Sequence, residues 1–323
     1  MNTDRRSFLR KNLFIGSSLL LANSLDALAG VAKSINTRGV YQSQLNIMYT
    51  NDLLGKVNAA YRDFGGLRQL HNTINNEEVS ALLFDAGGFL NSGHDQNDQL
   101  RGIDIMNKIN YHGVNLSAAD LVQGIASFKA LIPYINFPLL SCNYHFEDPL
   151  LRKTVKSYQI LQYGKFNVGV TAVGEKANIA GLVVSHPETA LNRVSHLLKE
   201  KHQCDVVICL AHLGFNDKAK INNRILSQSS IGVDCVIGGN ATEGKSQLWI
   251  VKNPKKDEVL LSSNHHKGLS TATLTIAFNE ENERAGLAFK RHVPGANKIQ
   301  SKQQLLSLMA ARQNKINNYN FNI

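Results

Sequence analysis

Short apolar runs alternate with helical patterns along most of the chain, beginning near residue 45. Apolar runs bounded by turn residues predict strands, and apolar residues spaced three and four apart predict helices. We expect strands at residues 45–50, 81–86, 138–143, 167–173, 205–212, 234–238, 248–251, 258–262, 272–278 and 287–291. We expect helices at residues 66–74, 100–109, 125–132, 188–201 and 216–227. Alternating strands and helices, followed by strands in succession, predict an α/β protein with largely buried sheets.

The predicted elements belong to one domain at residues 45–295, since no internal repeat and no proline-rich linker divides this stretch. A domain of this length is near the size at which a single hydrophobic core stops growing. Residues 30–44 are interpreted as a linker. Residues 296–323 are polar and rich in Gln, Asn and Lys, and they predict a C-terminal helix or tail.

The first 29 residues have the pattern of a signal peptide. A charged start is followed by an apolar stretch from Asn12 to Leu25 and by Ala27-Leu28-Ala29, which has the form of a cleavage site. Arg5-Arg6, followed by Ser-Phe-Leu, resembles a twin-arginine (Tat) signal, so we expect export to the periplasm or the exterior. The alternative is an amphipathic N-terminal helix of the mature domain. No other apolar run reaches the ~18 residues of a membrane span.

Charge and cysteine content narrow the function classes. Lys and Arg number 35 against 25 Asp and Glu, a net charge of +10, but no recognition helix, zinc-finger spacing or aromatic RNA platform accompanies them. We therefore expect no nucleic-acid partner, whereas an anionic or phosphorylated small molecule or a protein partner stays open. The four cysteines form no CxxC pair and predict buried thiols, with a disulfide as the alternative in an oxidising compartment.

Four predicted strands are followed by turn-like segments that carry polar or glycine residues. These segments are residues 51–55, 85–88, 211–214 and 238–242. In open α/β sheets the ligand site lies beyond the carboxyl ends of the strands. The four loops are therefore predicted to converge.

Seven sequence runs occur in the order and spacing of one known family. They are LNIMYTNDLLGKV, GGLRQL, LLFDAGGF, FPLLSCN, KFNVGVTAVG, CDVVICLAHLG and VDCVIGGN. Together they resemble the N-terminal domain of the 5′-nucleotidase group of calcineurin-like metallophosphoesterases over about residues 45–278. The resemblance implies a four-layer α/β/β/α sandwich, with two mixed sheets flanked by helices. It also implies a centre of two divalent ions, such as Mn, Zn or Fe, on the strand-end loops.

Position by position, the resemblance implies a degenerate metal site. Two family ligand positions are retained, at Asp52 and His212. The family's other ligands and its proton-donating histidine correspond to positions that here hold Leu54, Gly88, Ala118, Ala119, Asn240 and Thr242. Methyl, hydrogen and isobutyl groups have no lone pair, and the neutral oxygens of Asn and Thr suit these metals only weakly. We therefore expect no catalytic residue and no metal cofactor.

The retained pair and the remaining histidines each have a second interpretation. Asp52 can bond nearby backbone amides in an Asx-type turn and His212 can donate to a neighbouring carbonyl, as alternatives to a vestigial or single-ion ligand role. A rebuilt metal site would draw on other histidines. The candidates are His94, His112, His145, His265 and His266.

These observations favour one hypothesis and leave another open. The first is an exported metallophosphoesterase-like protein that has lost most of its metal ligands and acts as a non-catalytic binding or assembly module. The alternative is a metal-dependent phosphoester hydrolase with a single-ion or relocated site. Asp52 and His212 alone would give such an ion two protein ligands, fewer than the three usual in catalytic zinc sites.

Overall fold

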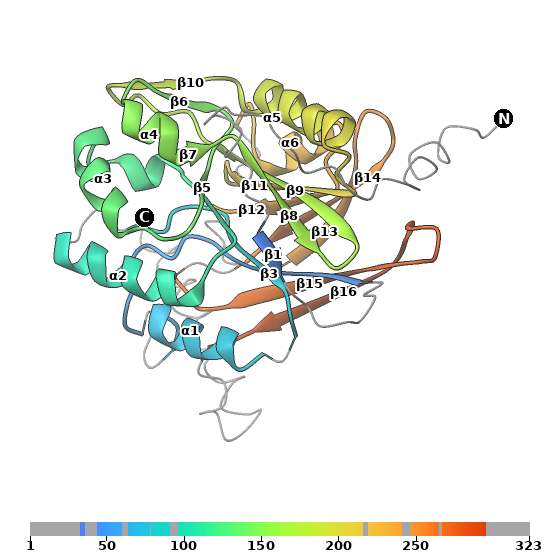
Figure 1. The fold of residues 1–323 in the computed structure, drawn as a ribbon, viewed down its shortest axis with the longest axis horizontal. Coiled ribbons are helices and arrows are strands. Elements are labelled where there is room, and N and C mark those ends of the chain that lie inside the picture. The colour runs from blue at the N-terminus through green and yellow to red at the C-terminus, as the bar shows by residue number, and fades with distance from the viewer. Residues whose placement is uncertain are drawn as a thin grey trace, which may run out of the picture.

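The computed structural model of the protein describes residues 33–35, 44–59, 64–77, 79–90, 96–215, 219–240, 247–264 and 267–294. Two seven-stranded sheets lie at its centre, with helices above and below them (Figure 1). Several sequence predictions lie outside the described residues. They are the signal peptide, most of the linker, the C-terminal helix or tail, Thr242, His94, His265 and His266.

The first sheet is parallel except at one edge, where β15 is antiparallel to both of its neighbours. Its order is β16 (Arg284–His292), β15 (Thr271–Phe278), β2 (Gln44–Thr50), β3 (Leu82–Asp85), β4 (Gly113–Asn115), β5 (Leu139–Leu140) and β7 (Val155–Lys156). Parallel pairing aligns the carboxyl ends of β2, β3 and β4 at one side of the sheet.

The second sheet has parallel central strands and mixed edges. Its order is β1 (Lys33–Ile35), β8 (Tyr158–Tyr163), β9 (Phe166–Gly174), β11 (Val206–His212), β12 (Cys235–Gly238), β14 (Glu258–Ser263) and β13 (Gln247–Lys252). β1 lies within residues 30–44 and pairs with β8. A separate two-stranded ribbon joins β10 (Leu182–Val184) to β6 (Tyr144–Phe146).

Helices cover the outer face of each sheet. Apolar residues of α1 (Leu67–Asn75), α2 (Gln96–Ile109) and α3 (Ile125–Leu131) pack in one buried cluster with residues of the first sheet. α5 (Pro187–His196) and α6 (Asn223–Ser229) pack in another with the second sheet. Shorter elements are α4 (Pro149–Thr154), a π-helical turn at Leu197–Lys201, and 3₁₀ turns at Ala118–Leu121 and Ile132–Tyr134. No helix among the described residues is long and apolar enough to cross a membrane.

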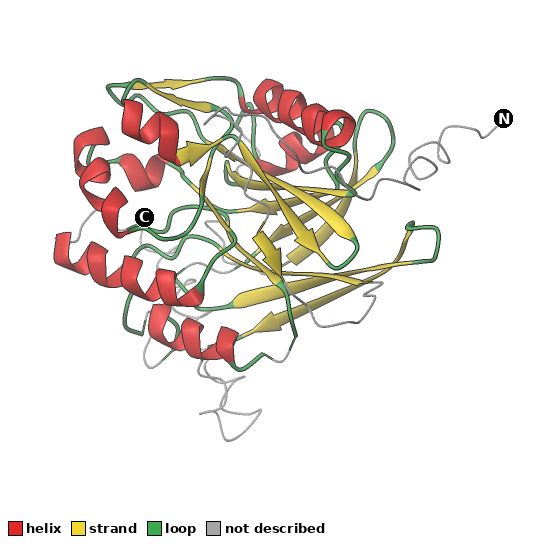
Figure 2. Cartoon of the chain, in the orientation of Figure 1, coloured by secondary structure: helices red, strands yellow, loops and turns green. Residues whose placement is uncertain are grey.

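The core between the sheets explains why they stay together. Side chains from both sheets, among them Tyr49, Phe84, Val170 and Ile208, are fully buried in one cluster between them. Burial of such side chains contributes roughly 1.5–3 kcal/mol each relative to exposure. The resulting order of helix, sheet, sheet and helix layers, seen in Figure 2, confirms the predicted four-layer sandwich.

Three local features differ from, or add to, the sequence predictions. The strand β8, whose residues alternate between buried and half-buried, was not predicted. The helix predicted at 216–227 begins only at Asn223, because the Asn222 side chain accepts a hydrogen bond from Ile225 N at 2.8 Å and caps the helix there. All four cysteines are free and buried, as the buried-thiol interpretation predicts.

Candidate functional site

The loops that follow β2, β3, β11 and β12 come together at the carboxyl ends of the two sheets. Asp52 N donates to Gly87 O at 2.8 Å and Leu54 N donates to Gly88 O at 2.9 Å, which joins the first two loops. Gly239 N donates to Ala211 O at 2.7 Å, which joins the other two. The predicted convergence is confirmed.

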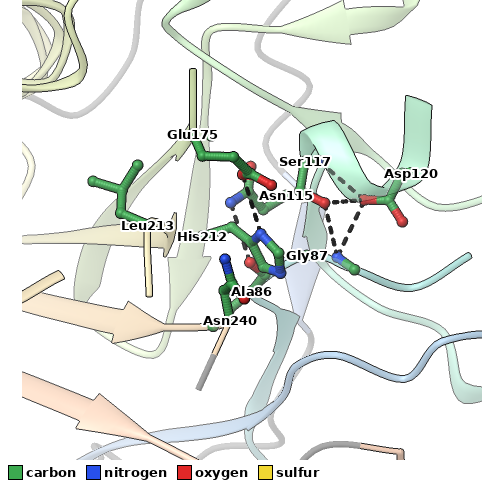
Figure 3. A network of polar contacts seen from close by, with 12 residues as sticks. Ala86, Gly87, Asn115, Ser117, Asp120, Glu175, His212, Leu213 and Asn240 are labelled. Carbon is green, nitrogen blue, oxygen red and sulfur yellow. Dashed lines mark hydrogen bonds and ion pairs between the residues drawn. The ribbon is translucent and has the colours of Figure 1, made fainter. Parts of the chain in front are cut away.

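The two retained family positions contact each other directly. His212 Nε2 lies 2.9 Å from Asp52 Oδ1, and its Nδ1 lies 3.1 Å from Glu175 Oε2. The imidazole is 2% exposed, and Figure 3 shows it between the strand ends with Glu175 beside it. Asp52 Oδ2 also accepts from Asn51 Nδ2 and from Asn240 N, both at 2.7 Å. Both ring nitrogens and both carboxylate oxygens of the pair therefore have protein partners.

This arrangement makes His212 a buried cation. Burial alone lowers the pKa of His212, but its hydrogen bonds to Asp52 and Glu175 outweigh that effect and raise the pKa well above the usual range. Burial alone raises the pKa of Asp52, but the hydrogen bond and the charge of His212 hold that pKa below its usual value. At neutral pH an imidazolium thus lies between two carboxylates.

Gly87 and Gly88 pass close to this ion pair. Gly88 has φ 71°, and a Cβ there would lie 3.0 Å from both Asp52 Oδ1 and His212 Nε2. A Cβ on Gly87 would lie 3.1 Å from His212 Cδ2. The space into which a side chain at position 88 would project is taken by the two members of the ion pair.

A third carboxylate, Asp120, holds the glycine loop from the opposite side. Asp120 Oδ2 accepts from Ser117 Oγ at 2.6 Å (Figure 3). The same oxygen accepts from Gly88 N at 3.1 Å, and Oδ1 accepts from Leu90 N at 2.8 Å. Ser117 and Asp120 also form a capping box around the turn that contains Ala118 and Ala119. Hydrogen bonds from backbone amides to these side chains therefore hold the glycine loop in place.

Two other positions that the resemblance aligns with family ligands, Asn240 and Leu54, contribute main-chain groups. Asn240, at φ 58°, has an exposed side chain, and its backbone N–H is the group that reaches Asp52 Oδ2. Leu54, at φ 51°, is half-buried and is joined to the glycine loop by its N–H. Neither side chain makes a polar contact with the ion pair.

Behind the ion pair lies a buried carboxyl, Asp85. Its Oδ2 accepts from Thr50 Oγ1 at 2.6 Å and its Oδ1 accepts from Gly87 N at 2.9 Å. Burial, together with the charges of the nearby Asp120 and Asp52, raises the pKa of Asp85 to about 7 against the lowering effect of these two hydrogen bonds. Asp85 is thus partly protonated near neutral pH.

The described histidines that could rebuild a metal site have other partners. His112 Nδ1 accepts from Leu83 N at 3.0 Å, and His145 Nε2 lies 3.1 Å from Ser185 Oγ. No group of three or more His, Cys, Asp or Glu side chains in the described part of the chain is arranged to hold a metal ion. A two-metal centre needs a dense set of such ligands. The described residues therefore do not fit one.

Comparisons with known proteins agree with the fold and the resemblance. The chain is 26% identical to a 5′-nucleotidase of Bos taurus over 242 residues, which cover 67% of the chain and 40% of that protein. Its structure is similar to that of a 5′-nucleotidase precursor from Thermus thermophilus, with a TM-score of 0.67 and 18% identity over 84% of this chain and 59% of that one. It is also similar to a calcineurin-like phosphoesterase from Bacillus subtilis, with a TM-score of 0.62 and 18% identity over 79% of this chain and 92% of that one. No family model matches the chain.

The chain therefore has the 5′-nucleotidase-type metallophosphoesterase fold, and about two thirds of its sequence is similar to that of a 5′-nucleotidase. It spans 40% of the bovine relative's length and 59% of the Thermus protein's.

The sequence analysis did not identify Glu175, the second carboxylate that contacts His212. It follows β9 directly, so it stands at the carboxyl end of a buried strand, as His212 stands at the end of β11. The expectation that a ligand site lies beyond the carboxyl ends of the strands would also have pointed to Glu175. The two structural alternatives named other partners than the structure shows: Asp52 accepts from a backbone amide, but from the distant one of Asn240, and His212 bonds two carboxylates and not a carbonyl.

Proposed function

We propose that the chain is a metallophosphoesterase-like protein that acts as a non-catalytic binding or assembly module. The observation that supports this proposal is the bonding of His212, whose two ring nitrogens are both engaged by the carboxylates of Asp52 and Glu175. A histidine binds a metal through a neutral ring nitrogen with a free lone pair. An imidazolium has none, so metal binding at Asp52 and His212 would require loss of a proton and rupture of a buried ion pair.

The residues at the other ligand positions make the exchange of the His212 proton for a metal ion unfavourable. Gly88 supplies a hydrogen and Ala118 a methyl group at positions where the resemblance implies an aspartate and an asparagine. An ion that displaced the proton of His212 would therefore gain few new bonds.

The proposal is tested by metal content and by turnover together. The purified protein is exposed to excess Mn²⁺ and Zn²⁺, desalted and analysed, and is assayed with a phosphomonoester. We expect substantially less than one ion per chain, and no turnover that depends on Asp52 or His212. Two ions per chain, or a turnover abolished in Asp52→Ala and His212→Ala but kept in His145→Ala, would contradict the proposal and support the hydrolase alternative.

We also propose that the protein is exported in the folded state through a twin-arginine signal at Arg5-Arg6. The support is the sequence pattern, together with the burial of the four free cysteines, because a thiol buried before transport is shielded from an oxidising compartment. Burial raises the pKa of Cys142 to about 11, so little reactive thiolate is present there. Cell fractionation tests the proposal: Arg5→Lys with Arg6→Lys should retain the protein inside, and an unchanged distribution would contradict it.

A further inference from the structure

A basic groove lies between α1 and α2, outside the strand-end site. The two helices lie side by side against the first sheet (Figure 1), and the groove between them has a volume of about 410 Å³. Small-molecule sites in proteins typically have volumes of roughly 300–1,000 Å³. Its cationic lining consists of Arg68, Arg101 and Lys108, with His71 beside them.

Helical spacing directs these side chains to the groove from both sides. On α1, Arg68 and His71 are three residues apart and lie on one face, about 100° around the helix from the buried Leu67 and Leu70. On α2, Arg101 and Lys108 are seven residues apart, or about two turns, and so lie on the same face. The two polar faces meet at the groove.

The charges in the groove are not balanced. Arg68 makes no side-chain hydrogen bond or ion pair with any described residue, and Asp104 is the one carboxylate in the lining. Arg101 lies 3.3 Å from Asp98 and Lys108 lies 2.7 Å from Asp104, but all four of these side chains are more than 40% exposed. Ion pairs this exposed contribute little to stability, so an incoming anion can displace them.

We propose that this groove binds a phosphorylated small molecule. Two guanidinium groups on facing helices match a phosphate, since each can donate two parallel N–H bonds to its oxygens. Val57 and Ile105 also line the groove and offer an apolar surface for the body of the ligand. The proposal goes beyond the proposed function and does not depend on it, because no lining residue belongs to the strand-end site.

The test uses phenylphosphonate, which carries a phosphonate dianion on an apolar ring and has no ester bond to hydrolyse. Calorimetric titration at low ionic strength should show one saturable site. Arg68→Gln and Arg101→Gln should each weaken binding by about tenfold or more, and Arg291→Gln, which removes an exposed arginine on β16, should change it less than about twofold. Asp104→Asn should tighten binding several-fold, a gain that damage to the fold cannot produce.

Four outcomes would overturn the proposal. The first is an absence of saturable binding, and the second is an equal loss in Arg291→Gln. The third is binding that survives Arg68→Gln but disappears in Asp52→Ala, which would place the anion at the strand-end site. The fourth is binding to vesicles containing anionic lipid without binding of phenylphosphonate, which would favour a membrane surface. None of these outcomes depends on metal content, so the groove and the proposed function can fail separately.

Discussion

The strand-end site and the groove between α1 and α2 differ in whether their charged side chains have charged partners. At the strand ends, His212 bonds the carboxylates of Asp52 and Glu175 in a buried or half-buried network, so each charged group there has a charged partner. In the groove, exposed cations outnumber carboxylates, and Arg68 lacks a polar partner among the described residues. The difference indicates that the strand-end network contributes to the stability of the fold, whereas the proposed anion site lies on the outer surface.

The largest expected effect is from removal of the buried cation. His212→Ala leaves the carboxylate of Asp52 without its main partner, and loss of one member of a buried ion pair costs about 3–5 kcal/mol of unfolding free energy. Denaturant unfolding would measure the loss. His145→Ala, which removes an exposed histidine bonded to Ser185, should cost less than about 0.5 kcal/mol. Equal effects in the two variants would mean that the ion pair is not a principal source of stability.

The second prediction concerns pH. The pKa of Asp85 is about 7 in the folded protein and near its ordinary value of 3.8 when unfolded, so the folded state binds more protons between these values. Stability should therefore fall as pH rises from about 4 to about 7, by at most roughly 1.4 kcal/mol per pH unit from this group. In the Asp85→Asn variant, the part of this pH dependence of stability that comes from Asp85 should be absent. Parallel slopes in the wild type and Asp85→Asn would show that the carboxyl is not held protonated.

The third prediction distinguishes the effect of a steric contact at position 88 from the effect of backbone strain on stability. In Gly88→Ala the new Cβ meets Asp52 and His212 at 3.0 Å, at a backbone φ of 71°. Gly124→Ala is the matched control, because Gly124 has φ 86° but nothing within 4 Å of an added Cβ. Gly88→Ala should be less stable than Gly124→Ala by about 1–2 kcal/mol, the range for overpacking. An equal cost would indicate that position 88 has room for a side chain.

The smallest expected effect is on the stability of groove variants. Arg68→Gln and Arg101→Gln alter exposed side chains, so their unfolding free energy should stay within about 0.5 kcal/mol of wild type. Thermal unfolding in the absence of ligand measures this. A larger loss in either variant would mean that these arginines support the helices, and would weaken the contrast between the two regions.

The fold was largely predictable because its strands follow a simple rule. Runs such as the one that forms β11 are continuously apolar, since both faces of that strand are buried. β8 was missed although its burial alternates, because Tyr and Gln occur at both its buried and its half-buried positions and obscure the alternation of apolar residues. The start of α6 depends on which of several polar residues caps it, and only the structure identifies Asn222.

The candidate site was predictable in its location and less so in its bonding. Strand-end loops pointed to Asp52 and His212, but their direct contact depends on the relative placement of the two sheets, which local sequence does not encode. Asp120 directly follows Ala118 and Ala119, yet its bonds to Gly88 and Leu90 join loops that are about 30 residues apart. Such contacts require the complete fold.

The most direct test of the central claim is the protonation state of His212, measured by ring ¹⁵N chemical shifts at neutral pH with and without Zn²⁺. We predict that both ring nitrogens carry a proton and that their shifts are unchanged by Zn²⁺, as expected for an imidazolium between Asp52 and Glu175. A neutral ring whose Nε2 shift moves on addition of Zn²⁺ would show that His212 is still a metal ligand, and would contradict the account.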